Sequence, residues 1–135
     1  MGETAGCGID VVEIARVERL LSRYPDSFAE RWFLASEIAE CLAGDSPGER
    51  FASHLAAKES VVKALGMDGR GQVPWRHIEV SGLAEGCMDV CLTGALATVA
   101  RQRGIGRISV SVSTTGGLAM AVAIASCGSA APANS

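Results

Sequence analysis

The chain has 135 residues, of which 48% are hydrophobic and only 4% aromatic, so we expect one domain with a core of Val, Leu, Ile and Ala. The formal net charge of −3 disfavours nucleic acid as a partner, and no apolar run approaches the roughly 20 residues that cross a bilayer. The N-terminus lacks the basic and then apolar pattern of a secretory signal. The five cysteines fit neither a zinc ribbon nor a Cys-x-x-Cys pair, so free thiols in a reducing, cytoplasmic setting are expected.

Apolar periodicity and the positions of Gly and Pro predict a series of short elements around one long helix. In chain order these are a strand over 6–10, a helix over 12–23, helices over 27–33 and 36–41, a long helix over 49–65, strands over 78–81 and 88–92, a helix over 93–103, and strands over 107–113 and 118–125. Pro25 is expected to separate the first two helices, and Ser36 to be an N-cap. Residues 1–127 are predicted to form the single domain, and 128–135 a disordered tail.

Three charged residues stand in the otherwise apolar and small-residue part of the long helix, namely Lys58, Glu59 and Lys63. Charges in such a segment must be paired, solvated or used for chemistry, because burying them alone is costly. Asp10 ends the first strand. Two carboxylates on different elements, with lysines beside one of them, suit a hard cation that holds a phosphorylated ligand. Alternatively, Glu59 and Lys63 form an ordinary i, i+4 ion pair, and Asp10 is a turn or cap residue.

A basic face on the first helix is a second candidate site. Arg16, Arg19 and Arg23 are spaced i, i+3 and i+7, so they lie on one side while the apolar residues face the core. Arginine suits the recognition of carboxylates on an acidic partner. The alternative is a solvated charged surface, with acidic residues mixed in.

The ordered motifs of the chain resemble those of the holo-(acyl-carrier-protein) synthase family. They are Gly8-Ile9-Asp10 with Glu13 and Arg16, Phe28-Ala29-Glu30-Arg31, Ser36-Glu37, Ala56-Ala57-Lys58-Glu59 with Lys63-Ala64-Leu65-Gly66, and Trp75-Arg76-His77-Ile78-Glu79-Val80. The resemblance covers about residues 7–125. It implies an α+β fold, in which an antiparallel sheet packs against a long helix, and a homotrimer with active sites between subunits.

The same resemblance implies the activity, which is Mg²⁺-dependent transfer of 4′-phosphopantetheine from coenzyme A to a serine of an acidic apo acyl carrier protein. The carrier would serve fatty acid, polyketide or related synthesis, and adenosine 3′,5′-bisphosphate would leave. Asp10 and Glu59 would hold Mg²⁺ or Mn²⁺, Lys63 would contact a phosphate, and Arg16 would lead the docking face. The serine proton would pass to Glu59 or to a metal-bound water. Residues expected to contact coenzyme A are Arg50, His54, Lys58, Lys63, Gly69, Gly71, Ser111, Ser113 and Thr114.

Two positions depart from the family pattern, because His54 stands where an arginine is common and Thr114 where a histidine is usual. The departures indicate altered coenzyme A binding, either in a specialised member or in an inactive one that only binds carrier proteins. His54 could equally be a partly exposed structural histidine, and Lys58 could extend into solvent. Glycines such as Gly69 and Gly71 need no ligand to explain them in a loop. We expect an active enzyme, because Asp10, Glu59 and Lys63 are all present.

Overall fold

A computed structural model describes residues 3–83 and 86–128 of the chain. Its elements are β1 (Thr4–Glu13), α1 (Ile14–Arg23), α2 (Pro25–Trp32), α3 (Ala35–Leu42), α4 (Pro47–Ala64), the 3₁₀ turn η1 (Trp75–His77), β2 (Ile78–Ser81), β3 (Cys87–Leu92), α5 (Gly94–Gln102), β4 (Ile105–Thr115) and β5 (Leu118–Cys127). Apart from Gly128, the tail predicted over 128–135 lies outside the described residues.

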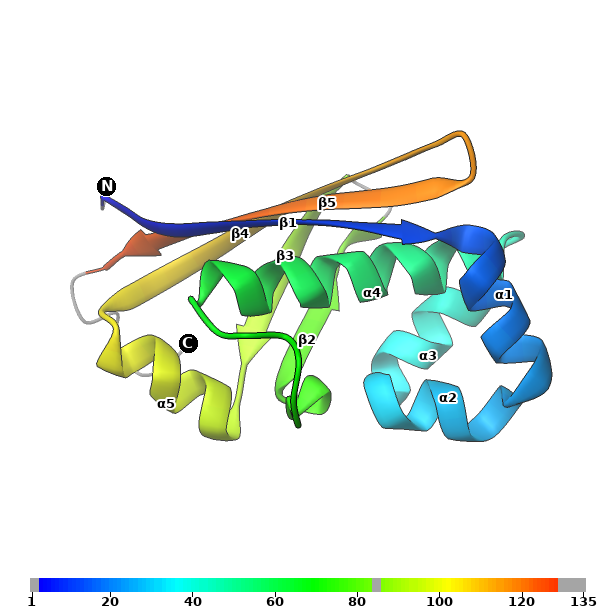
Figure 1. The fold of residues 1–135 in the computed structure, drawn as a ribbon, viewed down its shortest axis with the longest axis horizontal. Helices are drawn as coiled ribbons and strands as arrows, with labels where there is room; N and C mark the ends of the chain where they lie inside the picture. The colour runs from blue at the N-terminus through cyan, green and yellow to red at the C-terminus, as the bar shows by residue number, and fades with distance from the viewer. Residues whose placement is uncertain (1–2, 84–85, 129–135) are drawn as a thin grey trace.

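The strands of the described residues form one antiparallel sheet in the order β1-β5-β4-β3-β2. The first strand pairs with the last, and Asp10 lies opposite Ala121. Gly116 and Gly117 close the long hairpin of β4 and β5, and both have positive φ angles, which glycine adopts without strain. Figure 1 shows α4 crossing one face of this sheet, with α1, α2 and α3 gathered near one end of it. The predicted α+β architecture is confirmed.

Small residues on both sides let α4 lie unusually close to the sheet. The inner face of β5 presents Ala119, Ala121, Ala123 and Ala125, all buried. On β1, a Cβ atom added to Gly8 would lie 2.7 Å from the Cβ of Lys63 and 2.8 Å from the backbone nitrogen of Ala64. Glycine at this position therefore sets the distance between the strand that carries Asp10 and the helix that carries Lys63.

The long helix α4 ends as its sequence predicts. Gly66, with a φ of 78°, follows the helix, and its N–H donates to the Lys63 carbonyl at 2.9 Å. The Met67 N–H donates to the Val62 carbonyl at 3.1 Å, which completes a Schellman motif. Apolar residues recur along this helix at helical spacing and are buried, namely Phe51, Leu55, Val62 and Leu65.

The starts of the first two helices differ from the prediction. Val12 is not helical, because it pairs with Ala119 as part of β1, and α1 begins at Ile14. Pro25 opens α2 instead of merely separating two helices, since its fixed φ suits the first helical position.

The predicted N-cap at Ser36 is also wrong. Leu34 occupies the N-cap position of α3, and the Glu37 carboxylate accepts the N–H of Leu34 at 2.9 Å. Ser36 lies inside the helix, and its hydroxyl donates to Oε2 of Glu79 at 2.6 Å. A carboxylate at the third helical position has taken over the capping that we assigned to the hydroxyl.

The sheet face that points away from α4 is apolar and exposed on β1 and β5. The exposed fractions are 62% for Ile9, 52% for Val11, 41% for Val122 and 43% for Ile124. All five cysteines are free, as expected. Cys87 and Cys91 share one face of a strand by their spacing, which predicts two small core residues, but both are exposed. In the described part of the chain, no helix has both the length and the apolar character needed to cross a membrane.

Candidate active site

Asp10 of β1 and Lys63 of α4 form an ion pair at the edge of the helix–sheet contact. The Lys63 ammonium donates to Oδ1 of Asp10 at 2.9 Å and to the Ile9 carbonyl at 2.9 Å. Glu59 lies one helical turn before Lys63, so both side chains emerge from the same side of α4. The Lys63 side chain is 48% exposed, which leaves it accessible to a ligand. The three residues predicted to be catalytic therefore come together.

Glu59 lies beside a second carboxyl group in a partly buried position. Burial, and then the hydrogen bond and charge of Asp10, raise the pKa of Glu59 to about 8, while Lys63 and Arg16 oppose the rise. Two carboxyls that resist ionising together are stabilised by a divalent cation between them. Oδ2 of Asp10 is buried and, when both carboxyls are ionised, has no hydrogen-bond donor among the described residues. The pair therefore fits a hard cation, which would use that free acceptor.

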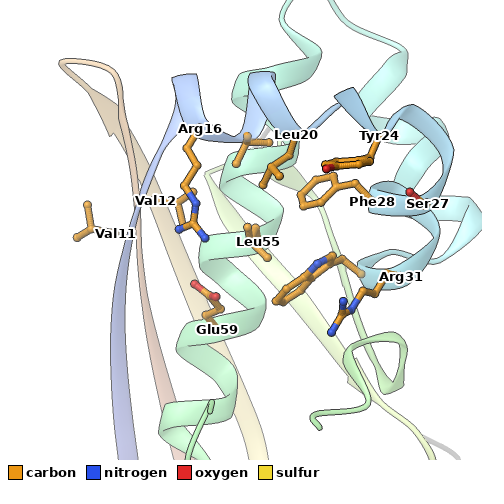
Figure 2. Close-up of a pocket in the computed structure, with 12 residues that line it drawn as sticks. Val11, Val12, Arg16, Leu20, Tyr24, Ser27, Phe28, Arg31, Leu55 and Glu59 are labelled. Atoms are coloured by element: carbon orange, nitrogen blue, oxygen red, sulfur yellow. The ribbon is translucent and has the colours of Figure 1, made fainter. Parts of the chain in front are cut away.

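A cavity of about 470 Å³ opens beside Glu59. Its apolar lining includes Leu20, Phe28, Trp32 and Leu55. Figure 2 shows the side chains of Arg16 and Glu59 directed toward one another on one side of it, with Arg31 on the α2 side. An apolar wall with a few charged groups is typical of a small-molecule site.

The basic face predicted on α1 is present next to this cavity. Arg16, Arg19 and Arg23 are all exposed, and Arg16 also lines the cavity. The guanidinium of Arg23 lies 5.5 Å from the ring centre of Tyr24, which is another lining residue. The face is therefore continuous with the mouth of the cavity.

A second, smaller cavity of about 250 Å³ brings together Arg50, Ser113 and Thr114, three of the residues expected to bind coenzyme A. Ser111 does not line it and is exposed on β4. Arg50 and Glu59 stand nine positions apart on α4, which places them about 14 Å apart along the axis and about half a turn around it. The two cavities therefore lie on different sides of the helix.

Comparisons with known proteins identify the family. A sequence profile described as the 4′-phosphopantetheinyl transferase superfamily matches residues 6–122. The chain is 43% identical over 117 residues to a holo-[acyl-carrier-protein] synthase of Moorella thermoacetica, which covers 87% of this chain and 90% of the relative. The chain belongs to the holo-[acyl-carrier-protein] synthase family.

Solved structures of this synthase family share the fold. The enzyme from Neisseria meningitidis has a TM-score of 0.79 at 31% identity, and the match covers 90% of this chain and 98% of that one. The enzyme from Helicobacter pylori, solved in complex with coenzyme A, has a TM-score of 0.73 at 30% identity, with 89% and 99% covered. The predicted family, its enzyme class of phosphopantetheinyl transferases and the fold are confirmed.

Two residues that we expected to contact coenzyme A in this synthase are buried instead. The Lys58 side chain is 0% exposed and pairs with Glu37 at 2.6 Å, so both the predicted phosphate contact and the alternative of extension into solvent are wrong. The His54 side chain is also 0% exposed, 3.5 Å from Oε2 of Glu37 and 3.7 Å from Oε1 of Glu40. Neither a phosphate contact nor a partly exposed histidine fits that position.

The roles of the two loop glycines stay predictions. Gly69 and Gly71 are exposed in the segment between α4 and η1, and a Cβ atom at either position would meet no neighbour within 4 Å. This open space has room for a ligand, but two exposed loop glycines do not need a ligand to explain them.

Sequence reasoning missed several residues around the large cavity of this family member. Trp32 and Arg31 line it, and Arg31 belongs to a motif to which we gave no role. A tryptophan in a chain with 4% aromatic residues was a usable signal. No sequence signal marked the role of Glu37, because its partner Lys58 is distant in sequence and the two residues meet only in the folded chain.

Proposed function

We propose that this protein transfers the 4′-phosphopantetheine group of coenzyme A to a serine of an apo acyl carrier protein. The serine oxygen would bond to the β-phosphorus and lose its proton to Glu59 or to a water. The bond between that phosphorus and the bridging oxygen would break, and adenosine 3′,5′-bisphosphate would leave. The carrier would belong to fatty acid, polyketide or related synthesis in the cytoplasm. The coenzyme A complex of the Helicobacter pylori relative supports coenzyme A as the donor.

The grouping of Asp10, Glu59 and Lys63 carries the proposal. Asp10 and Glu59 would hold Mg²⁺, or Mn²⁺ in its place, and such an ion supplies positive charge next to the diphosphate. The Lys63 ammonium, with nearly half of its surface exposed, would contact a phosphate oxygen and offset the charge that develops on the leaving group. A preserved catalytic trio argues against the alternative of a binding module without turnover.

An acidic carrier protein would dock on α1. The exposed arginines Arg16, Arg19 and Arg23 offer bidentate partners for carboxylates. Because the Arg16 side chain is directed toward Glu59 at the same cavity, a carrier bound to this helix would bring its serine to the proposed catalytic residues.

Coenzyme A would bind between two copies of the chain. Arg50 and Thr114 lie in the cavity on another side of α4 from Glu59, so one ligand would meet both groups most easily if a neighbouring subunit supplied one of them. The exposed apolar face of β1 and β5, which includes Ile9 and Val122, supports burial against other copies. Both features favour the expected homotrimer.

Intact-protein mass spectrometry tests the transfer. Apo carrier proteins of several pathways are incubated with the protein, coenzyme A and Mg²⁺, and modified carriers gain the mass of one phosphopantetheine. The gain should disappear with a chelator and with Glu59→Ala, and persist with Glu30→Ala, a change on the exposed side of α2. Carriers that bind without gaining mass would refute the proposed transferase activity and support the alternative, a carrier-binding module without turnover.

Subunit complementation tests the shared site. Glu59→Ala and Arg50→Ala variants, each impaired alone, are unfolded together and refolded as a mixture. Mixed assemblies contain sites with both residues intact, so activity should reappear. A mixture no more active than its components would contradict a site built from two subunits.

A further inference from the structure

The ammonium of Lys58 holds the backbone of two tryptophans. It donates to the Trp32 carbonyl at 2.7 Å and to the Trp75 carbonyl at 3.1 Å, and its remaining hydrogen bond goes to Oε1 of Glu37 at 2.6 Å. An ammonium group has three donors, so all of them are used. The side chain is fully buried and has nothing left to offer a ligand.

Together with Lys58, Glu37 forms a buried hydrogen-bonded frame. Its Oε1 also accepts the Leu34 N–H at 2.9 Å, and its Oε2 accepts the Val80 N–H at 3.2 Å. Burial alone would raise the pKa of Glu37, but the neighbouring His54 and the Lys58 ammonium lower it by more, so Glu37 is ionised at neutral pH. The frame therefore ties α4 to the end of α2, the start of α3, η1 and β2.

The two tryptophans that Lys58 holds stack on each other. Their ring centres are 4.4 Å apart and the ring planes are inclined by 32°. Trp32 lines the large cavity, and Trp75 behind it is 7% exposed. Lys58 directly precedes Glu59 in the chain, so one turn of α4 carries both the cavity carboxyl and the anchor of Trp32, which lines the same cavity.

We propose that Lys58 is a positioning residue that fixes the stacked indoles, of which Trp32 lines the same cavity as Glu59, and contacts no substrate itself. A displacement of about 1 Å at a reacting group can cost about 100-fold in rate. Loss of the anchor should therefore lower kcat for carrier modification far more than it raises KM for coenzyme A. This kinetic consequence rests on the proposed function, whereas the arrangement of the indoles does not.

The indole pair can be observed directly, because Trp32 and Trp75 are the only tryptophans of the chain. Stacked indoles give an exciton couplet in circular dichroism, and Trp75→Phe assigns the signal by removing it. In Lys58→Met the amplitude of the couplet should fall to less than half of the wild-type amplitude. The value of kcat should fall about tenfold to 100-fold. KM for coenzyme A should change less than about threefold. A variant that only loses stability would change neither the couplet nor kcat at temperatures where it is folded.

Two further variants keep the test decisive. Lys58→Met leaves Glu37 buried without its ammonium partner and with only His54 beside it, which is strongly destabilising. Lys58→Met combined with Glu37→Gln removes the Glu37 charge and keeps one acceptor oxygen, which can serve the N–H of Leu34 or of Val80 but not both. It should recover part of the lost stability without recovering the couplet or kcat. The matched control is Ser60→Ala, a buried position on α4 whose hydroxyl donates within the helix to Ala57 at 2.8 Å, and it should change neither readout.

Two results would overturn the inference. One is a folded double variant that keeps the couplet and the wild-type kcat, and the other is a lost couplet with kcat unchanged. If the wild-type protein modifies no carrier, the proposed function fails by itself, and the couplet of the double variant then decides whether Lys58 positions the indoles.

Discussion

Without a bound cation, the protein should lose stability as the pH rises through neutrality, because Glu59 must give up its proton in an unfavourable place. The pKa of Glu59 rises from 4.5 to about 8, and the unfolded chain keeps the ordinary value. Between these two values the folded state binds more protons than the unfolded state, so the free energy of unfolding falls with increasing pH. The contribution is fully present below about pH 4.5 and is lost above about pH 8.

The expected loss follows from the size of the rise in pKa. At about 1.4 kcal/mol per pKa unit, a rise from 4.5 to about 8 would correspond to close to 5 kcal/mol. Glu59 is only partly buried, and solvent screening reduces the figure to roughly 1–3 kcal/mol. Glu37 does not obscure the effect, because its pKa is lowered from 4.5 and its contribution changes at more acidic pH.

Urea unfolding at pH 5.5, 7 and 8.5 with a chelator present, at one fixed protein concentration, measures this loss. Glu59→Gln stays neutral throughout and should flatten the decline, whereas Glu30→Gln, on the exposed side of α2, should reproduce the wild-type curve. Excess Mg²⁺ should stabilise the wild type more at pH 8.5 than at pH 5.5. Parallel curves for wild type and Glu59→Gln would refute the role assigned to this carboxyl.

Three other substitutions have defined outcomes. Gly8→Ala drives a methyl group into the backbone of α4 and should lower the free energy of unfolding by about 3 kcal/mol in a urea titration. The control is Gly69→Ala, where the added methyl group has open space around it. This control should change the free energy of unfolding by less than about 0.5 kcal/mol. Arg16→Glu should raise KM for an acidic carrier at least about tenfold, and the exposed Arg107→Glu on β4 should not; equal effects would contradict docking on α1. Thr114→His should lower KM for coenzyme A, more strongly at pH 6 than at pH 8. An unchanged KM would contradict the proposal that coenzyme A binds in the smaller cavity, which Thr114 lines.

Local signals in the sequence predicted where Asp10, Glu59 and Lys63 would lie, whereas the α+β fold came from the family resemblance of the ordered motifs. Helical spacing placed Glu59 and Lys63 on one side of α4, and a strand was predicted to carry Asp10, although β1 continues to Glu13. The catalytic roles of these residues stay predictions. The element boundaries were less accurate where competing choices are close in free energy, as at Pro25, which can either end one helix or begin the next.

The frame around Lys58 could not be predicted, because it depends on contacts between distant segments. A lysine next to a candidate catalytic glutamate looks like a phosphate ligand, and only the position of Glu37, 21 residues away, shows that its charge is already satisfied. His54 was misread for the same reason, since two carboxylates from α3 face it. Burial of charged residues is a property of the packed molecule and leaves no local pattern.

The packing of α4 divides the molecule into a part that resists mutation and a part that tolerates it. Most of α4 is buried from its start to its end, so the helix that bears Glu59 has little freedom to vary. The rim of the large cavity, by contrast, includes exposed residues such as Tyr24, Ser27 and Arg31. If the proposed docking on α1 holds, preference for a new carrier protein can therefore evolve, or be selected from a library, on α1 and α2 while the proposed catalytic residues stay in place.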